Sequence, residues 1–153
     1  MNNLLRKITP RLIFLPPVAL WLFLFRDFLT RKVLVVEDTF AVYAVAKYYL
    51  DNLLSGVFPS WNPYVLWGMA HVRQIGEFNP IWFVTPLLNG LGLDFYRSFL
   101  CTLVIYFLAG VYGFYLLARV VLKDDLLAYW AGLLILFSSL GMTMFIQPTI
   151  LML

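Results

Sequence analysis

Two adjacent acids, Glu37 and Asp38, open the stretch of this sequence that is best equipped for chemistry. A carboxylate can accept the proton of an attacking hydroxyl group, or it can bind a divalent cation such as Mg²⁺ or Mn²⁺. Asp38 is therefore a candidate catalytic base and a candidate metal ligand. Its alternative role is to cap the helix that follows it. Glu37 is a candidate supporting acid, and the alternative for this side chain is an ordinary solvated loop charge.

The residues that follow these acids include side chains suited to binding a sugar or a phosphate. Aromatic rings can stack on a sugar, or they can instead anchor the chain in the headgroup layer of a membrane. An Asn-Pro pair most simply sets a turn, and a single histidine without a partner at ligand spacing is weak evidence for a metal site. The candidates for substrate binding are Trp61, Asn62, Tyr64, His71 and Arg73.

Composition narrows the class of protein. The chain is 63% hydrophobic and only 12% charged, which is typical of an integral membrane protein. Its net charge of +3 comes from basic residues that are spread along the sequence, so no nucleic-acid partner is indicated. The sequence contains no glycine-rich phosphate loop, catalytic triad or Cys/His cluster, which argues against nucleotide hydrolysis and zinc chemistry.

Three apolar segments are candidates for crossing a bilayer, whose core of about 30 Å needs roughly 20 helical residues. The first follows a basic N-terminus at residues 1–11, covers residues 12–29 and is best interpreted as an uncleaved signal anchor. The second covers residues 98–118 and the third residues 126–146, both without a charged side chain. Small residues such as Gly132 provide surfaces on which these helices can approach one another closely.

Residues 30–97 connect the first two candidate spans. Within them, residues 38–55 are predicted to form an amphipathic helix lying along the membrane interface, with Gly56 ending it. An ordered loop rich in proline and aromatic residues follows, and residues 81–93 form an apolar piece too brief to span, which we interpret as re-entrant or interfacial. The expected apolar face of the amphipathic helix consists of Val42, Val45, Ala46, Tyr49 and Leu53.

Under the positive-inside rule, the basic residues near the first candidate span are almost balanced between the two orientations. Arg26 and the basic residues just after it oppose those of the N-terminus, but Arg119 and Lys123 in the short second connection favour an inside N-terminus. The predicted fold is an all-α integral membrane protein. It has about three transmembrane helices, one amphipathic interfacial helix and an ordered extracytoplasmic loop.

The order of these features resembles the N-terminal region of the YfhO-like bacterial membrane proteins, which belong to the GT-C class of polytopic glycosyltransferases. In that family one span leads into a loop with an acidic residue, a helix ending in glycine and three short motifs. The corresponding residues here are Asp38, Gly56, Pro59–Tyr64, Gly68-Met69 and Gly76–Pro80. The sequence departs from the family at Ala70, where proline is usual, and at Asn79, where tyrosine is common.

The resemblance implies a multi-pass enzyme of the bacterial cytoplasmic membrane that takes a sugar from a polyprenyl-phosphate carrier. The acceptor would be a glycan or an envelope polymer outside that membrane, and Asp38 occupies the position of the family's acidic residue after the first span. On this interpretation we expect the chain to be the N-terminal part of a larger polytopic protein. The alternative is a non-enzymatic membrane subunit or a transporter fragment, although spans without charges favour a catalytic surface loop over a conducting path.

Overall fold

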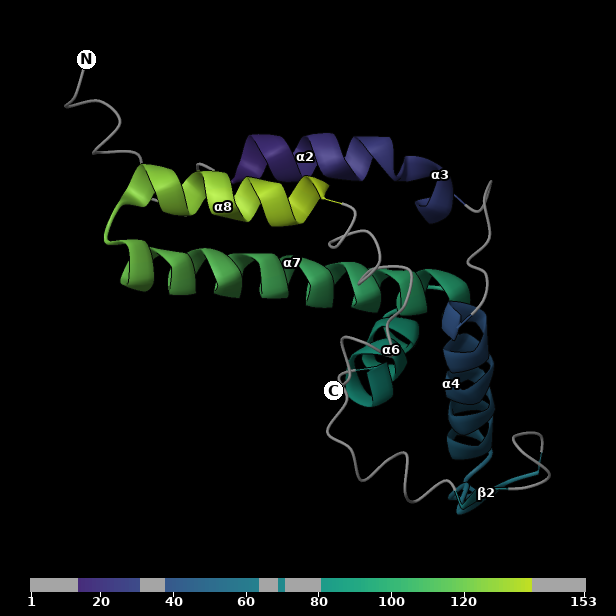
Figure 1. Cartoon of the computed structure of the whole chain (residues 1–153). Helices are drawn as coiled ribbons and strands as arrows, with labels where there is room; N and C mark the ends of the chain where they lie inside the picture. Colours follow the sequence, from purple (N-terminus) through teal and green to yellow (C-terminus); the bar gives the residue numbers. More distant parts are fainter. Residues whose placement is uncertain (1–13, 31–37, 64–68, 71–80, 139–153) are drawn as a thin grey trace.

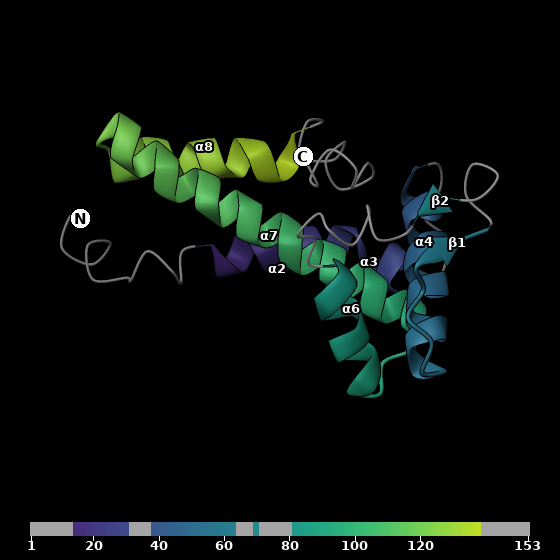
Figure 2. The same cartoon turned by 90° about the horizontal axis from the view of Figure 1, so that it is seen from below.

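The computed structural model describes residues 14–30, 38–63, 69–70 and 81–138, and over these residues the chain is mostly helical, as predicted. Figures 1 and 2 show an elongated arm made of three helices, from which two further helices leave at a steep angle. The arm consists of α2 (Leu15–Leu24), α7 (Phe95–Leu122) and α8 (Asp125–Phe137). The two crossing helices are α4 (Asp38–Leu54) and α6 (Ile81–Gly90).

Helix α7 is the longest element and the axis of the arm. It begins where the Asp94 carboxylate accepts a hydrogen bond of 3.1 Å from the backbone N–H of Arg97, and it ends at Lys123, whose φ of 53° is left-handed. The helix contains the whole predicted span 98–118 and exceeds it at both ends. Among the described residues it is the one helix long and apolar enough to cross a membrane.

A tight turn returns the chain from α7 into α8. The carboxylate of Asp124 caps α8 by accepting hydrogen bonds from the backbone N–H groups of Leu126 at 2.8 Å and Leu127 at 2.9 Å. The prediction of one continuous helix over residues 126–146 is wrong at its C-terminal part, because α8 ends at Phe137 and Ser138 is extended. The Ser138 hydroxyl donates to the Ile135 carbonyl at 3.2 Å, and such serine bonds compete with the helical ladder.

The first predicted span, residues 12–29, is also divided, since α2 stops at Leu24 and a short α3 covers Arg26–Leu29. Prolines occupy the first turn of α2, where the missing N–H groups cost nothing, so they mark its start and do not kink it. Trp21 of α2 is fully buried and stacks on Phe107 of α7 at a centroid distance of 5.2 Å. This contact ties the first helix to the axis of the arm.

Helix α4 agrees closely with the predicted amphipathic helix at residues 38–55. Gly56, with φ of 74°, ends it, and the backbone N–H of Val57 reaches the Asn52 carbonyl at 2.9 Å, which makes a Schellman turn. Lys47 Nζ lies 2.6 Å from Asp51 Oδ2, one turn later on the exposed side of the helix. Ala46, Tyr49 and Leu50 are buried against the rest of the protein.

Helix α6 covers most of the apolar piece 81–93 and packs between α4 and α7. Its Thr85 hydroxyl donates a buried hydrogen bond of 2.9 Å to the Thr102 hydroxyl of α7, which itself donates to the Ser98 carbonyl at 2.8 Å. On the other side, the ring of Trp82 meets that of Tyr49 edge to face at 5.1 Å. The helix that was expected to be re-entrant or interfacial thus joins α4 to the end of the arm.

One small departure from the all-α prediction lies beyond the end of α4. Strand β1 (Trp61–Asn62) pairs antiparallel with β2 (Met69–Ala70), with Trp61 opposite Ala70 and Asn62 opposite Met69. The Tyr48 hydroxyl of α4 donates to the Trp61 carbonyl at 3.0 Å. This bond fixes the short hairpin against the C-terminal half of α4.

Candidate functional site

Asp38, the predicted base, is the first residue of α4. Five residues later, the ring of Tyr43 packs against Phe95 at 5.2 Å and Phe99 at 5.4 Å, both in the first turns of α7. Five helical residues span about 7.5 Å. The amino end of α4 therefore lies beside the amino end of α7, as Figure 1 also shows.

Trp61 and Asn62 form strand β1, which lies near the carboxyl end of α4, the end opposite Asp38. Their strand is attached through Tyr48, which follows Asp38 by ten residues, or about 15 Å of helix axis. The hairpin lies near the carboxyl end of α4 in Figure 1. The described residues thus do not bring the predicted base together with the predicted sugar-stacking ring.

The two strand residues differ strongly in exposure. The Trp61 side chain is 54% exposed, whereas Asn62 is only 1% exposed and makes its contacts within the protein. An exposed indole can stack on a sugar or enter a headgroup layer. A buried amide agrees better with the alternative role of shaping the turn. The remaining predicted site residues, Glu37, Tyr64, His71 and Arg73, lie outside the described residues.

Metal binding at Asp38 stays a prediction. The part of the chain that the structure describes contains no group of three or more His, Cys, Asp or Glu side chains arranged to hold a metal ion. The Asp38 side chain and the residues 31–37 before it are not among those described.

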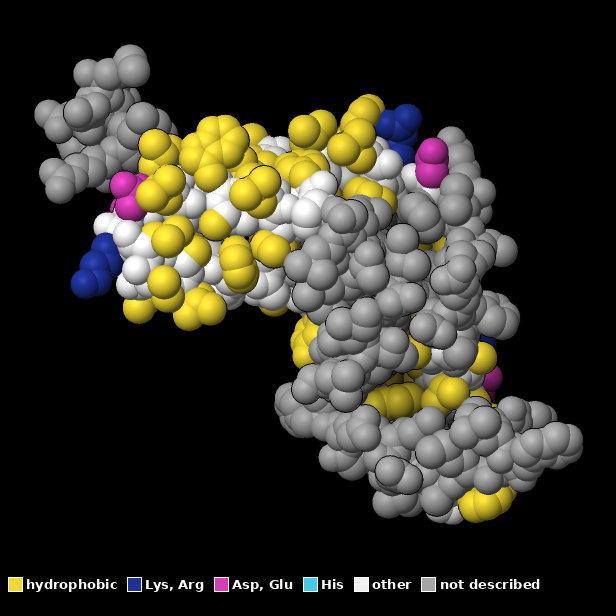
Figure 3. All heavy atoms as spheres, in the orientation of Figure 1, with side chains coloured by type: hydrophobic (Ala, Val, Ile, Leu, Met, Phe, Trp, Pro, Cys, Tyr) yellow, Lys and Arg dark blue, Asp and Glu magenta, His cyan; other side chains and the backbone are white. Residues whose placement is uncertain are grey.

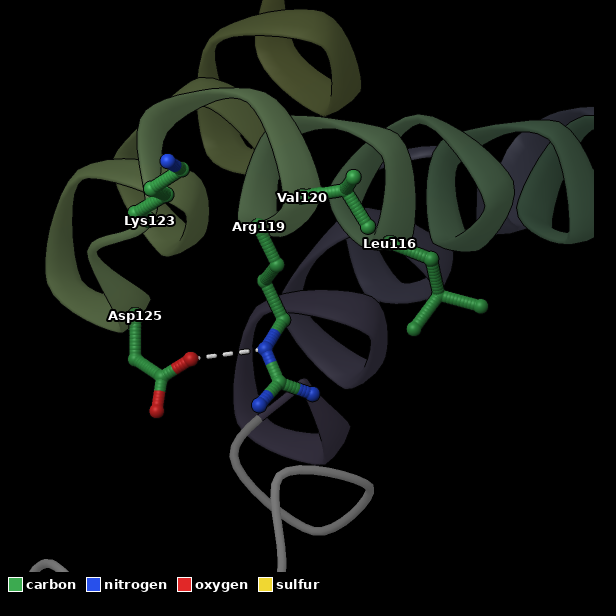
Figure 4. A pocket seen from close by; sticks show the side chains of 5 residues that line it. All are labelled: Leu116, Arg119, Val120, Lys123 and Asp125. Carbon is green, nitrogen blue, oxygen red and sulfur yellow. Dashed lines mark hydrogen bonds and ion pairs between the residues drawn. The ribbon is translucent and has the colours of Figure 1, made fainter.

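A second polar site lies at the α7–α8 turn and was not predicted as a site. Figure 4 shows a shallow hollow in which the Arg119 and Asp125 side chains point toward one another, with Nε 2.6 Å from Oδ1. Lys123 lines the same hollow, and its αL backbone forms the turn. In the sequence analysis Arg119 and Lys123 served only to orient the chain. The Asp-Asp pair just before an apolar run is a helix-start pattern, and it could have indicated the tight turn that brings Asp125 to Arg119.

Comparisons of this chain with protein-family models, with curated proteins and with solved structures find no match. Its function must therefore be argued from the arrangement of its own residues.

Proposed function

We propose that the arm formed by α2, α7 and α8 crosses a lipid bilayer. Support comes from α7, in which the stretch between Arg97 and Arg119 is uncharged and about 33 Å long, close to the bilayer core of about 30 Å. In this proposal the apolar helices α2 and α8 belong to the first and third spans. The resulting protein is a multi-pass membrane protein with about three spans.

The surface of the arm supports this placement. Figure 3 shows hydrophobic side chains along the arm, with charged side chains gathered at its two ends. Leu20, Ile105 and Leu134, one from each helix, are 52%, 53% and 70% exposed. Helices that expose apolar side chains on their outer faces suit a lipid surrounding better than water.

The charged groups at the two ends of α7 form ion pairs. At the amino end Arg97 Nε lies 3.3 Å from Asp94 Oδ2, and at the carboxyl end Arg119 is paired with Asp125. Positively charged Lys123 adds to the carboxyl end, so the positive-inside rule favours the cytoplasm for that end. The amino end of α7, with α4 and α6 beside it, then lies at the outer surface.

On this placement the chain is the N-terminal part of a glycosyltransferase that uses a polyprenyl-phosphate sugar and an extracytoplasmic glycan or envelope polymer as acceptor. The observation that carries this proposal is the position of Asp38, at the end of α4 that lies beside the outward end of α7. A polyprenyl tail lies in the bilayer, so its phosphate and sugar sit at the surface. Asp38 is thus at the level where the sugar is offered.

The chemistry assigned to Asp38 is that of a general base. Its carboxylate accepts the proton of the acceptor hydroxyl as the oxygen attacks the anomeric carbon, while the bond from that carbon to the phosphate oxygen breaks. The products are the glycosylated acceptor and polyprenyl phosphate. Cationic groups or a divalent ion such as Mg²⁺ or Mn²⁺ would stabilise the departing phosphate, and Asp38 is the candidate ligand for such an ion.

The test is the substitution Asp38→Asn in the complete natural protein, assayed for sugar transfer from a polyprenyl-phosphate donor. Asparagine caps a helix about as well as aspartate, so insertion and abundance should stay near normal. A lost general base typically costs 10²- to 10⁴-fold in rate, or about 3 to 5 kcal/mol of barrier. Activity should fall by that factor.

The matched control is Glu37→Gln, which should cost much less. If Asp38→Asn keeps its activity within a few-fold of the wild type, Asp38 is only a cap and the base lies elsewhere. If neither the wild type nor the variants transfer sugar from any polyprenyl-phosphate donor, the proposed activity is wrong and the alternative, a non-enzymatic membrane subunit or a transporter fragment, is favoured.

A further inference from the structure

The carboxyl end of α4 and the turn after it expose a cluster of large apolar side chains, far from the arm. We call this cluster the apolar tip. Its members range from 37% to 73% exposed, and none carries a charge. Clusters of this kind on a protein surface usually mark a binding surface. The apolar tip consists of Leu53, Leu54, Val57, Phe58 and Trp61.

Backbone hydrogen bonds hold the apolar tip in one shape. In the Schellman turn the Gly56 N–H reaches the Leu53 carbonyl at 3.0 Å and the Val57 N–H reaches the Asn52 carbonyl at 2.9 Å. The strand end of the tip is fixed by the Tyr48 hydroxyl, which donates to the Trp61 carbonyl at 3.0 Å. A surface that is already formed loses little conformational freedom when it binds.

The apolar tip continues the face of α4 that is buried against the rest of the protein. Tyr49 and Leu50 are 8% and 5% exposed, and one turn later, at the same positions around the helix, stand Leu53 and Leu54 at 37% and 73%. The polar positions Lys47, Asp51 and Ser55 also repeat at one-turn intervals, on the side of α4 opposite Tyr49 and Leu53, whereas Leu54 lies at the edge of that polar side, three residues after Asp51. The apolar face of α4 therefore continues beyond the residues that α6 covers.

The direction in which the apolar face of α4 points indicates which surroundings contact the apolar tip. Tyr49 points at Trp82 of α6, and α6 lies on the side of α4 toward which α7 extends, as both Figure 1 and Figure 2 show. In the proposed placement, α7 extends from the outer surface into the bilayer. The face that carries Tyr49 and Leu53 therefore points toward the lipid, while the apolar tip lies about 17 Å along α4 from its contact with α7.

From these observations we infer that the apolar tip inserts into the outer leaflet of the bilayer, at the boundary between headgroups and acyl chains. This inference rests on the proposed membrane placement and adds a second lipid contact, separate from the spans. Leucine, phenylalanine and tryptophan are the side chains that interfacial helices bury at this depth. The contact holds α4 flat on the membrane and so keeps Asp38 at the level of a lipid-linked sugar.

The experiment places a polarity-sensitive fluorophore at single cysteines in a Cys101→Ala background of the full chain. The protein is reconstituted in vesicles of phosphatidylcholine and phosphatidylglycerol, and fluorescence is quenched either by doxyl-labelled lipid or by aqueous iodide. Leu53→Cys and Phe58→Cys report on the apolar tip. Asp51→Cys, on the polar side of α4, is the matched control, and Ile105→Cys in α7 is the reference for a spanning residue.

We expect blue-shifted emission and loss of signal to doxyl lipid at positions 53 and 58, and iodide quenching at position 51. Iodide quenching at 53 and 58 equal to that at 51 overturns the inference. So does protection of 53 and 58 from both quenchers, because then a protein surface covers the apolar tip. Position 105 distinguishes failure of the inference about the apolar tip from failure of the membrane placement. Iodide quenching at position 105 would overturn the membrane placement itself, whereas quenching by doxyl lipid there would agree with it.

Discussion

At the scale of single residues, Gly132 is, among the glycines that the structure describes, the one with least room for a side chain. A Cβ atom built on it would lie 2.9 Å from Cζ of Phe14 and 3.5 Å from Cβ of Tyr115. The Phe14 ring cannot move easily, because it is buried and packs edge to face against Tyr115 at 4.8 Å and Tyr129 at 5.2 Å. The missing side chain is what allows α8, α7 and the start of α2 to meet.

Gly132→Ala should therefore destabilise the arm. Overpacking of a filled site costs typically about 1–3 kcal/mol, which exceeds the helix-propensity gain of about 1 kcal/mol for replacing glycine by alanine. Thermal unfolding of the purified protein in detergent, followed by circular dichroism, measures the change. The matched control is Gly113→Ala, because a Cβ at Gly113 meets nothing within 4 Å.

Gly113→Ala should leave the melting temperature unchanged or raise it. A melting temperature for Gly132→Ala at or above that of Gly113→Ala would show that Phe14 yields without cost. The packing assigned to Gly132 would then be wrong.

At the scale of elements, the α7–α8 turn depends on one side chain. Asp124 satisfies two backbone N–H groups at the start of α8, and the residue before it already adopts a left-handed backbone. Asp124→Ala should lower the stability of the hairpin by about 1 kcal/mol, the usual cost of removing an N-cap. Chemical denaturation followed by near-UV circular dichroism tests this.

Asp124→Asn is the control for the cap, because the amide oxygen can accept the same hydrogen bonds without the charge. It should retain most of the stability. Equal losses for the two variants would point to the charge of Asp124, and not to its hydrogen bonds, as the stabilising feature.

Helix ends were predictable from the sequence where a local signal sets them. Gly56 supplies a positive φ, so the end of α4 was predicted within one residue. The end of α8 at Phe137 was missed, because hydropathy continues through a serine that turns the backbone away from the helix. The end of α7 was missed as well, since Lys123 is a residue type that seldom adopts a left-handed backbone.

The candidate site was predictable only in part, for a related reason. The sequence placed Asp38 and the Trp61-Asn62 pair in one loop, but the distance between them depends on a contact across thirteen residues. The hydrogen bond from Tyr48 to the Trp61 carbonyl attaches the strand to the far half of α4. Hydrophobic periodicity carries no information about such a contact, because it reports on one element at a time.

At the scale of the whole molecule, the proposed membrane placement predicts which groups share a side of the bilayer. Ser60 lies beyond the carboxyl end of α4, on the side of α4 and the hairpin. Lys123 lies at the opposite end of α7, in the turn to α8. Both side chains are exposed, so cysteines placed there should report their surroundings without disturbing the fold.

The proposed topology predicts opposite labelling at these two positions in intact cells. In a Cys101→Ala background, Ser60→Cys should react with a membrane-impermeant maleimide, and Lys123→Cys should react only after the cells are permeabilised. The reason is the positive charge at the carboxyl end of α7, since Arg119 and Lys123 favour the cytoplasm. Lys123→Cys removes one of these charges, so Asp125→Cys, which keeps both, serves as the control at the same end.

Reaction at positions 123 and 125 without reaction at position 60 would invert the orientation. Asp38 would then lie on the cytoplasmic side, where sugars are offered as nucleotide conjugates as well as lipid-linked ones, and extracytoplasmic transfer would be excluded. Reaction at all three positions would place both ends of α7 on one side, which no spanning helix allows. Labelling at position 60 alone is the result expected from the proposed topology, in which the donor phosphate, the amino end of α4 and the acceptor all lie at the outer surface.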